Sequence, residues 1–291
     1  MKKLILLLTI AATCAVAGYS QAYHYDVNGD GVVTAADVTE YTVNGVKFKM
    51  VAVAGGTFTM GATSEQGSDA AAAEKPTHKV TVSSFYIGQT EVTQELWQAV
   101  MGSNPSKFKG AKLPVERVSW DDCQEFLRKL NAKTGKQFRL PTEAEWEFAA
   151  RGGAKSQGYK YSGSNTLSVV AWYDENSYDK GSSSPDYGTH DVATKRANEL
   201  GIYDMSGNVW EWCQDWYGTY PSDAQTNPTG PASGSDRVNR GGCWFRWFGS
   251  CRVSNRNYDS PDHRDDDLGL LYSFPCKKTS MKKMPEWGEE R

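Results

Sequence analysis

The segment Gly201 to Tyr217, GIYDMSGNVWEWCQDWY, restricts the fold of this chain more than any other stretch. It places three tryptophans and the acids Asp204, Glu211 and Asp215 around a Ser-Gly-Asn turn. Tryptophan rings are costly to leave in water, and their N–H groups need partners once they are buried. We therefore expect a core strand beside a polar site. The alternative is a Trp-rich core strand whose acids are simply solvated.

The composition favours an irregular, loop-rich protein that is held together by aromatic side chains. The 291 residues include 28 glycines, 10 tryptophans and 15 tyrosines. This length allows one sizeable domain with appendages, or two small domains. A formal net charge of -3, without a basic patch that alternates with aromatic residues, argues against nucleic-acid binding.

Residues 1–22 are predicted to be an export signal. Two lysines precede the apolar run Leu4 to Ala12, and cleavage sites of the small-x-small type follow at Ala17 and Ala22. The run is too short to span a membrane. We therefore expect an exported protein that is periplasmic, displayed on the cell surface or secreted. Lipoprotein processing at Cys14 is a less favoured alternative.

Five cysteines would remain after cleavage, namely Cys123, Cys213, Cys243, Cys251 and Cys276. In an oxidising compartment, an odd number leaves at least one thiol free or in an intermolecular bond. No CxxC pair is present and the four histidines are scattered, so the spacing fits no zinc site. We expect a disulfide between Cys213 and Cys251, because both flank the densest aromatic segments.

The segment 26–37, DVNGDGVVTAAD, has the spacing of a calcium-binding loop. Its predicted oxygen ligands are the side chains of Asp26, Asn28, Asp30 and Asp37 and the backbone carbonyl of Val32. The alternative is a polar linker. The loop resembles one half of a dockerin, but dockerins carry two such repeats and one is visible here. Residues 23–45 are therefore predicted to be a small calcium-stiffened module with its linker, and binding to a cohesin is in doubt.

Capping residues and alternation predict the regular elements. Helices are expected after the N-cap residues Thr93, Ser119 and Thr142. Alternating apolar residues predict two strands joined by a turn in 46–60 and further extended chain in 79–87. The charged, aperiodic residues 275–291 are expected to be disordered.

Seven motifs, in order, resemble the formylglycine-generating enzyme family, also called sulfatase-modifying factors. They are GGTFTMG (55–61), EKPTHKVTVSSFYI (74–87), TEVT (90–93), PVERVSW (114–120), RLPTEAEWEFAARGG (139–153), GIYDMSGNVWEW (201–212) and RVNRGG (237–242). The resemblance implies an α+β, C-type-lectin-like fold with little regular secondary structure. It places this domain in residues 46–274.

Enzymatic members of the family hold copper between two cysteines and use molecular oxygen to oxidise a sulfatase cysteine to formylglycine. Paired thiolates suit Cu(I), so the loss of one ligand should abolish the site. The family motif has these cysteines at the fourth and ninth positions after Gly-Gly, which here are Arg246 and Cys251. Because Arg246 replaces the first ligand, we expect a domain that has lost catalysis. The alternative is a copper-dependent oxidase that uses Cys251 with Cys243.

The resemblance also implies a structural calcium ion in the segment Asp204 to Glu211. The family site uses side-chain oxygens at its two ends and backbone carbonyls between them, which here correspond to Asp204, Gly207, Val209 and Glu211. A set of oxygen ligands suits a hard cation. The ion would tie the tryptophan-rich strand to its preceding turn.

The segment Cys243 to Leu271 keeps the family skeleton but carries unusual side chains between the fixed points. They are Trp244, Phe245, Arg246, Trp247, Phe248, Tyr258, Asp259, His263, Asp265, Asp266 and Asp267. Many relatives have asparagine at several of these positions, and Tyr, Asp and His codons differ from an asparagine codon by one first base. The segment is similar to the variable region of a diversity-generating retroelement target, which implies a ligand-binding face rich in rigid aromatics.

The expected function is therefore ligand binding by an exported domain, and the ligand is a protein, a glycan or a small molecule. The copper-dependent oxidase is the second candidate. An assembly module docked through the calcium loop 26–37 is the third. For the unusual side chains, the alternative is that the Trp and Phe run packs inward and the Asp run forms a solvated turn.

Overall fold

The computed structural model describes residues 23–24 and 38–276. The predicted export signal and residues 277–291 lie outside this part of the chain. The predicted ligands of the N-terminal calcium loop, Asp26, Asn28, Asp30, Val32 and Asp37, also lie outside it. Among the described residues, none of the helices combines the length and the apolar character that a membrane crossing requires.

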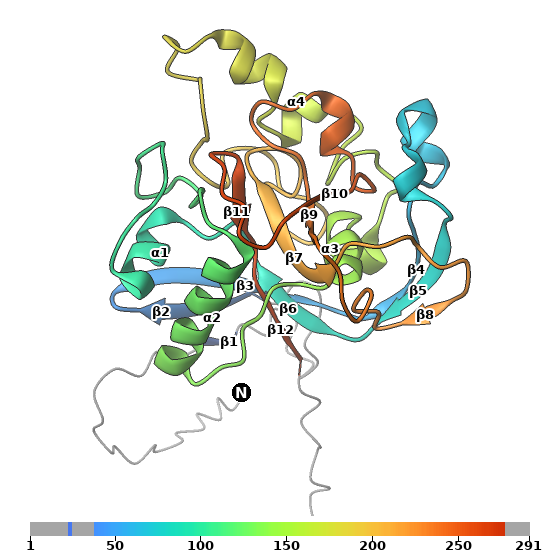
Figure 1. Cartoon of the computed structure of the whole chain (residues 1–291), viewed down its shortest axis with the longest axis horizontal. Coiled ribbons are helices and arrows are strands. Elements are labelled where there is room, and N and C mark those ends of the chain that lie inside the picture. Colours follow the sequence, from blue (N-terminus) through green and yellow to red (C-terminus); the bar gives the residue numbers. More distant parts are fainter. Residues whose placement is uncertain (1–22, 25–37, 277–291) are drawn as a thin grey trace, which may run out of the picture.

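Three small β-sheets form the framework (Figure 1). The five-stranded sheet contains, in spatial order, β1 (Tyr23–His24), β2 (Val38–Val43), β3 (Val46–Val53), β6 (Phe85–Gly88) and β12 (Ser273–Pro275). The four-stranded sheet contains β10 (Asn257–Asp259), β9 (Arg237–Arg240), β7 (Trp210–Trp216) and β11 (Leu268–Leu270). The three-stranded sheet contains β4 (Gly56–Met60), β5 (His78–Val82) and β8 (Gln225–Thr226). The pairs β7–β11 and β5–β8 are parallel, and the others are antiparallel.

Of the four α-helices that the structure describes, three begin where their caps predict, and the last was not predicted. In chain order, the four are α1 (Gln94–Met101), α2 (Trp120–Thr134), α3 (Glu143–Ala150) and the single turn α4 (Leu167–Val170). The side chains of Thr93, Ser119 and Thr142 each accept a hydrogen bond from a backbone N–H in the first turn of the helix that follows. Short 3₁₀ helices are η1 (Ser64–Asp69), η2 (Ala72–Glu74), η3 (Gly153–Lys155), η4 (Asp174–Asn176), η5 (Tyr178–Lys180) and η6 (Phe248–Cys251).

The two strands predicted in 46–60 are present, but they belong to different sheets. β3 pairs with β2 and β6, whereas β4 pairs with β5. At the junction, a Cβ atom on Gly55 would lie 2.5 Å from the carbonyl oxygen of Val82. Only glycine allows this close approach of the two backbones, and the chain crosses here from one sheet to the next.

The hydrophobic core has two main clusters. In the first, α1 and α2 pack beside the five-stranded sheet, with the rings of Trp97 and Phe126 stacked 4.9 Å apart. The second surrounds Trp146 of α3. β2 precedes residue 46, yet it supplies Tyr41 and Val43 to the first cluster. The packed unit therefore begins before the start of the expected domain.

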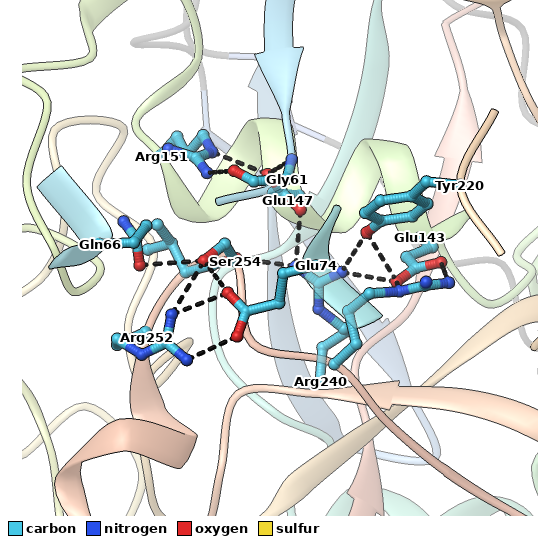
Figure 2. A network of polar contacts seen from close by, with 12 residues as sticks. Gly61, Gln66, Glu74, Glu143, Glu147, Arg151, Tyr220, Arg240, Arg252 and Ser254 are labelled. Atoms are coloured by element: carbon cyan, nitrogen blue, oxygen red, sulfur yellow. Dashed lines mark hydrogen bonds and ion pairs between the residues drawn. The ribbon is translucent and has the colours of Figure 1, made fainter. Parts of the chain in front are cut away.

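Buried ion pairs join α3 to strand β9 and to the loops around it (Figure 2). Arg240 of β9 is completely buried, and its guanidinium donates to Glu143 at 2.6 Å and to Glu147 at 2.7 Å. The two glutamates lie four residues apart, so they share one face of α3. Glu143 also accepts from Arg256 Nε at 2.5 Å, and Glu147 accepts from Arg151 Nε at 2.9 Å. We call these five residues the α3 ion-pair network.

A second buried pair fixes the loop between β4 and β5. Arg252 binds both carboxylate oxygens of Glu74, at 2.6 and 2.7 Å. The hydroxyl of Ser254 donates to the same carboxylate, and Arg252 also donates to the backbone carbonyl of Asp69 at 2.9 Å. Several family motifs meet in these contacts, so their charged residues have a structural role in the core.

Replacing Arg240 with Met should destabilise the protein strongly. The change keeps most of the side-chain volume but leaves Glu143 and Glu147 without their shared cation, and removing one partner of a buried ion pair typically costs about 3–5 kcal/mol. Urea unfolding followed by circular dichroism measures the loss. Arg128→Met is the matched control, because Arg128 pairs with Glu125 on the exposed side of α2 and should contribute little. Equal effects of the two substitutions would contradict the role assigned to the network.

Candidate functional site

The tryptophan-rich segment forms β7 and the turn before it, so the prediction of a core strand is confirmed. Trp212 is completely buried, and its indole N–H donates to the carbonyl of Val118 at 3.0 Å. The three acids Asp204, Glu211 and Asp215 are also buried. The alternative in which these acids are solvated is therefore wrong.

Asp204 and Glu211 lie near another buried acid, Glu91. Burial raises the pKa of Asp204 to about 6 and that of Glu211 to about 8. Burial, and then the charges of Asp204 and Glu211, raise the pKa of Glu91 well above its usual value. Glu91 accepts hydrogen bonds from Asn208 Nδ2 at 2.7 Å and from the backbone N–H of Val209 at 3.2 Å. In the sequence, Glu91 stands out only as part of the TEVT motif, and this motif does not indicate that Glu91 lies near Asp204 and Glu211.

The predicted calcium ligands lie along the turn that leads into β7. Asp204 has a φ of 60°, and its Oδ2 accepts a hydrogen bond from the backbone N–H of Ala193 at 2.7 Å. Glu211 Oε2 accepts from the indole N–H of Trp146. Glu211 Oε1 is buried and has no hydrogen-bond partner among the described residues. One oxygen of the predicted set is thus available to a cation.

In the described part of the chain, no group of three or more His, Cys, Asp or Glu side chains is arranged to hold a metal ion. Side chains alone therefore do not complete a metal site there. A cation at Asp204 and Glu211 would therefore also need the backbone carbonyls of Gly207 and Val209. Hard cations accept such mixed sets of carboxylate and carbonyl oxygens.

The predicted disulfide between Cys213 and Cys251 is wrong. Both cysteines are free and buried, as are Cys123 and Cys243, and the partly exposed Cys276 is also free. Cys213 lies on β7 in the core cluster around Trp146, whereas Cys251 packs in a separate small cluster. Both cysteines lie close to aromatic segments in the sequence, but this does not reveal that they pack in different clusters.

The two candidate copper ligands are neutral thiols in the core. Cys243 Sγ donates to Asp267 Oδ2 at 3.2 Å. Cys251 Sγ packs against Gly242, where a Cβ atom would lie only 2.8 Å from the sulfur. Burial raises the pKa of both thiols, which disfavours the thiolate form that binds copper. Arg246, at the position of the first family cysteine, is exposed and lies over the ring of Phe245.

The side chains of the predicted ligand-binding segment differ in exposure. The exposed ones are Arg246, Trp247, Phe248, Tyr258 and Asp265. The partly buried ones are Phe245, Asp259, His263 and Asp266, and the buried ones are Trp244 and Asp267. In the Trp and Phe segment, some side chains are therefore buried and others are exposed. The same is true of the Asp segment.

Trp244 is the buried centre of an aromatic group. Its ring lies 4.9 Å from those of Tyr187 and Phe245, 5.3 Å from Phe108 and 5.9 Å from Tyr178, measured between ring centroids. Tyr187 and Phe108 come from irregular loops, and Tyr178 begins the short 3₁₀ helix η5. Sequence reasoning missed them because such loops show no periodicity.

Two more large aromatic side chains follow Phe245 closely in the chain. Trp247 and Phe248 are exposed, and their rings lie 4.8 Å apart at the start of η6. Lys160 lies over the ring of Phe248 at 5.6 Å. We call Tyr178, Phe245, Trp247 and Phe248 the aromatic face.

The remaining predicted residues lie on and after the edge strand β10. The ring of Tyr258 stacks on Tyr217 at 4.2 Å. Asp259 accepts a hydrogen bond from Asn239 at 2.9 Å, and His263 Nε2 lies 3.9 Å from Asp259 Oδ1. The structure therefore brings Asp259 and His263 together, whereas Tyr258 packs on Tyr217.

Comparison with known proteins agrees with this architecture. The family model for the Sulfatase-modifying factor enzyme 1-like domain matches residues 34–271. The chaperone protein LppX of Paenibacillus barcinonensis is 33% identical over 93% of this chain and 98% of its own length. The formylglycine-generating enzyme of Streptomyces coelicolor is 33% identical over 63% of this chain and 62% of the enzyme.

A solved structure, that of Treponema denticola variable protein 1, has a TM-score of 0.72 and 36% sequence identity. The similarity covers 82% of this chain and 99% of that protein. The match of the family model includes every strand of the three sheets except β1 and β12, which lie before and after it. This chain therefore belongs to the sulfatase-modifying factor family and has the formylglycine-generating-enzyme-like α+β fold that its motifs predicted.

Proposed function

We propose that this protein is an exported, non-catalytic member of the family that binds a ligand through the aromatic face. The observation that carries the proposal is the exposure of large rings: Tyr178 is 47% exposed, Trp247 49% and Phe248 39%. Clustered apolar side chains on a surface are characteristic of binding sites, and aromatic rings provide contact area at a low cost in conformational entropy. The sequence segment that contributes most of these rings is the one that resembles a variable region.

The backbone beneath the aromatic face is firmly held, which supports a binding role. The N–H of Trp244 donates to the carbonyl of Asn208 at 2.8 Å, and its indole N–H donates to the carbonyl of Asp266 at 3.2 Å. The carbonyl of Arg246 accepts a hydrogen bond from the N–H of Asp174 at 3.2 Å. A surface that is ordered before binding loses less entropy when a ligand arrives.

The solved relative from T. denticola is named a variable protein. That name agrees with the interpretation of the segment 243–267 as a variable, ligand-contacting region on a constant scaffold. Rigid aromatics at such positions suit protein, glycan and small-molecule ligands alike.

Loss of catalysis is supported by the chemistry of the two thiols. Cys243 and Cys251 are buried and neutral, and Arg246 stands where the family enzymes have their first copper ligand. When the purified protein is incubated with copper, oxygen and a peptide that contains the C-x-P-x-R sequence, we expect mass spectrometry to detect no formylglycine. The S. coelicolor enzyme serves as the positive control. Formylglycine above the level of the enzyme-free blank would favour the oxidase instead.

Replacing both Trp247 and Phe248 with Ala should abolish binding without loss of stability. Truncation of central aromatic contacts commonly costs at least ~2 kcal/mol of binding free energy, which corresponds to a loss of affinity of about 30-fold. The measurement is binding of labelled protein to glycan and peptide arrays, with the melting temperature recorded in parallel. Val169→Ala, which shortens another exposed apolar side chain, is the control. Unchanged array binding by the double variant would exclude the aromatic face as the site.

We also propose a structural calcium ion bound by Asp204, Glu211 and the carbonyls of Gly207 and Val209. Two observations support it: Glu211 Oε1 is buried without a partner, and three buried acids repel one another at this place. A divalent cation would satisfy the free oxygen and offset the repulsion. The calcium loop 26–37 remains a separate prediction.

Calcium should raise the melting temperature, and chelation with EGTA should lower it. At 100 times the dissociation constant, a bound ion stabilises a protein by about 2.7 kcal/mol. To separate the two predicted sites, the titration is done in a variant that carries Asp30→Ala and Asp37→Ala, with and without Glu211→Gln. The calcium effect should persist in the first variant and vanish in the second. Persistence in both would place the ion elsewhere.

A further inference from the structure

A cavity of about 380 Å³ lies beside the N-terminus of α3, between the end of β7 and the loop that follows it. Its walls include Glu143, Asp215, Trp216, Tyr220 and Arg256. The residues that line it differ from those of the aromatic face. Charged groups of the α3 ion-pair network thus form one wall of a space that the proposed function does not use.

The loop that closes this cavity is anchored at several points. β8 lies within the loop and pairs with β5, through Gln225 opposite Val80. Next to it, Asn227 accepts from the N–H of Ser83 at 2.7 Å and donates to the hydroxyl of Ser83 at 3.0 Å. The carbonyl of Gly218 accepts a hydrogen bond from Arg256 at 3.0 Å. These contacts keep the cavity formed when it is empty.

The loop also approaches Asp215 very closely at Gly230. This glycine has a φ of 71°, and a Cβ atom on it would lie 3.0 Å from Asp215 Cβ and 2.9 Å from the carbonyl oxygen of Trp216. A side chain here would force the loop away. Asp215 is therefore held in the cavity wall with only 4% of its surface exposed.

Asp215 is a buried acid without a cation partner. Its Oδ2 accepts a hydrogen bond from the backbone N–H of Glu143 at 3.0 Å, and no other described residue donates to this carboxylate. The charges that act on it are the acids Glu143 and Glu145, which repel it, and the guanidinium of Arg256, which attracts it more weakly. Burial, followed by the charge of Glu143, raises the pKa of Asp215 to about 8. Buried carboxylates are normally paired, and Asp215 is the lining acid of this cavity that lacks an ion pair among the described residues.

The neighbouring arginines are already engaged. Arg256 donates through Nε and Nη2 to Glu143 and through Nη1 to the carbonyls of Ala73 and Gly218. Arg240 is shared between Glu143 and Glu147. Arg237 lies against the ring of Trp216 at 3.3 Å and donates to the carbonyl of Gln214, and it forms no ion pair with Asp215, although its Nε is buried without a partner. Each glutamate of this wall therefore has its cation, whereas Asp215 is in contact with none.

We propose that this cavity binds a small ligand that carries an ammonium group, with the ligand cation placed against Asp215. A monocation would neutralise the uncompensated carboxylate of this wall, whereas an anion would add to the repulsion from Glu143. The rings of Trp216 and Tyr220 in the cavity wall provide faces that attract cations. The proposal uses none of the residues of the aromatic face and is independent of ligand binding there.

Three probes of similar size and different charge test the proposal: ethanolammonium, ethylene glycol and glycolate. Binding is measured from NMR shifts of the Trp216 indole and the Gly230 amide at pH 8.5. Ethanolammonium should bind at least 10-fold more tightly than ethylene glycol, and glycolate should not bind. Equal affinity for the cationic and neutral probes would replace the proposal with a site for uncharged polyols.

Asp215→Asn provides the matching variant, because its amide oxygen can still accept the N–H of Glu143. Ethanolammonium affinity should fall at least 10-fold in this variant and stay unchanged in Asp223→Asn, which alters an exposed acid of the same loop. Retained affinity in Asp215→Asn would overturn the proposal.

A second readout shows whether Asp215→Asn keeps the fold. The folded-state pKa of about 8 exceeds the unfolded value of about 3.9, so the folded state holds an extra proton between these pH values. The stability of the natural protein should then fall as the pH rises through this window. Asp215→Asn should make that fall smaller, because Asp204 and Glu211 also contribute to it, and should melt several degrees higher than the natural protein at pH 8, with no gain at pH 4. A melting temperature below that of the natural protein at pH 8 would contradict an unpaired Asp215.

Discussion

The fold depends first on the guanidinium of Arg240, which is completely buried between Glu143 and Glu147. A charge in the core is tolerated only where its partners are in place, so this arginine accepts a single arrangement of β9 and α3. Most of the chain is irregular, and hydrophobic contacts alone would allow many similar packings of such loops. Directional ion pairs select one of them. The pair of Arg252 with Glu74 has the same effect on the loop between β4 and β5.

Side chains that hold the fold together can be distinguished from side chains that form its surface. Charged residues of the family motifs, such as Glu143, Arg240 and Arg252, point inward and hold the scaffold together. The unusual residues Trp247 and Phe248 point outward and bear little of the stability. The scaffold and the aromatic face can therefore differ in how freely they accept substitution. The aromatic group around Trp244 lies at the boundary, because its buried ring supports the exposed ones.

Local signals in the sequence predicted local structure correctly. The side chains of Thr93, Ser119 and Thr142 cap helices because a cap requires only residues within one turn. The burial of β7 followed from its tryptophans, and the family motifs predicted the fold. Contacts between distant segments could not be predicted in this way. The approach of Glu91 to Glu211, the contact of Tyr178 with Trp244 and the separation of Cys213 from Cys251 all depend on how loops cross. The unpaired state of Asp215 became visible only when the partners of the neighbouring arginines were known.

The strand pairing of β7 has a consequence for the segment that follows Arg240. On one side of β7, Glu211 lies opposite Arg240, and on the other side it lies opposite Gly269. The segment between these two residues therefore leaves and returns at the same level of one sheet, and β10 within it pairs with β9. The backbone ladders fix its ends, and the buried side chains of Trp244, Arg252 and Arg256 tie its middle to the core. Mutation can thus explore new surfaces at its exposed positions while the ladders and the buried positions keep the backbone path unchanged.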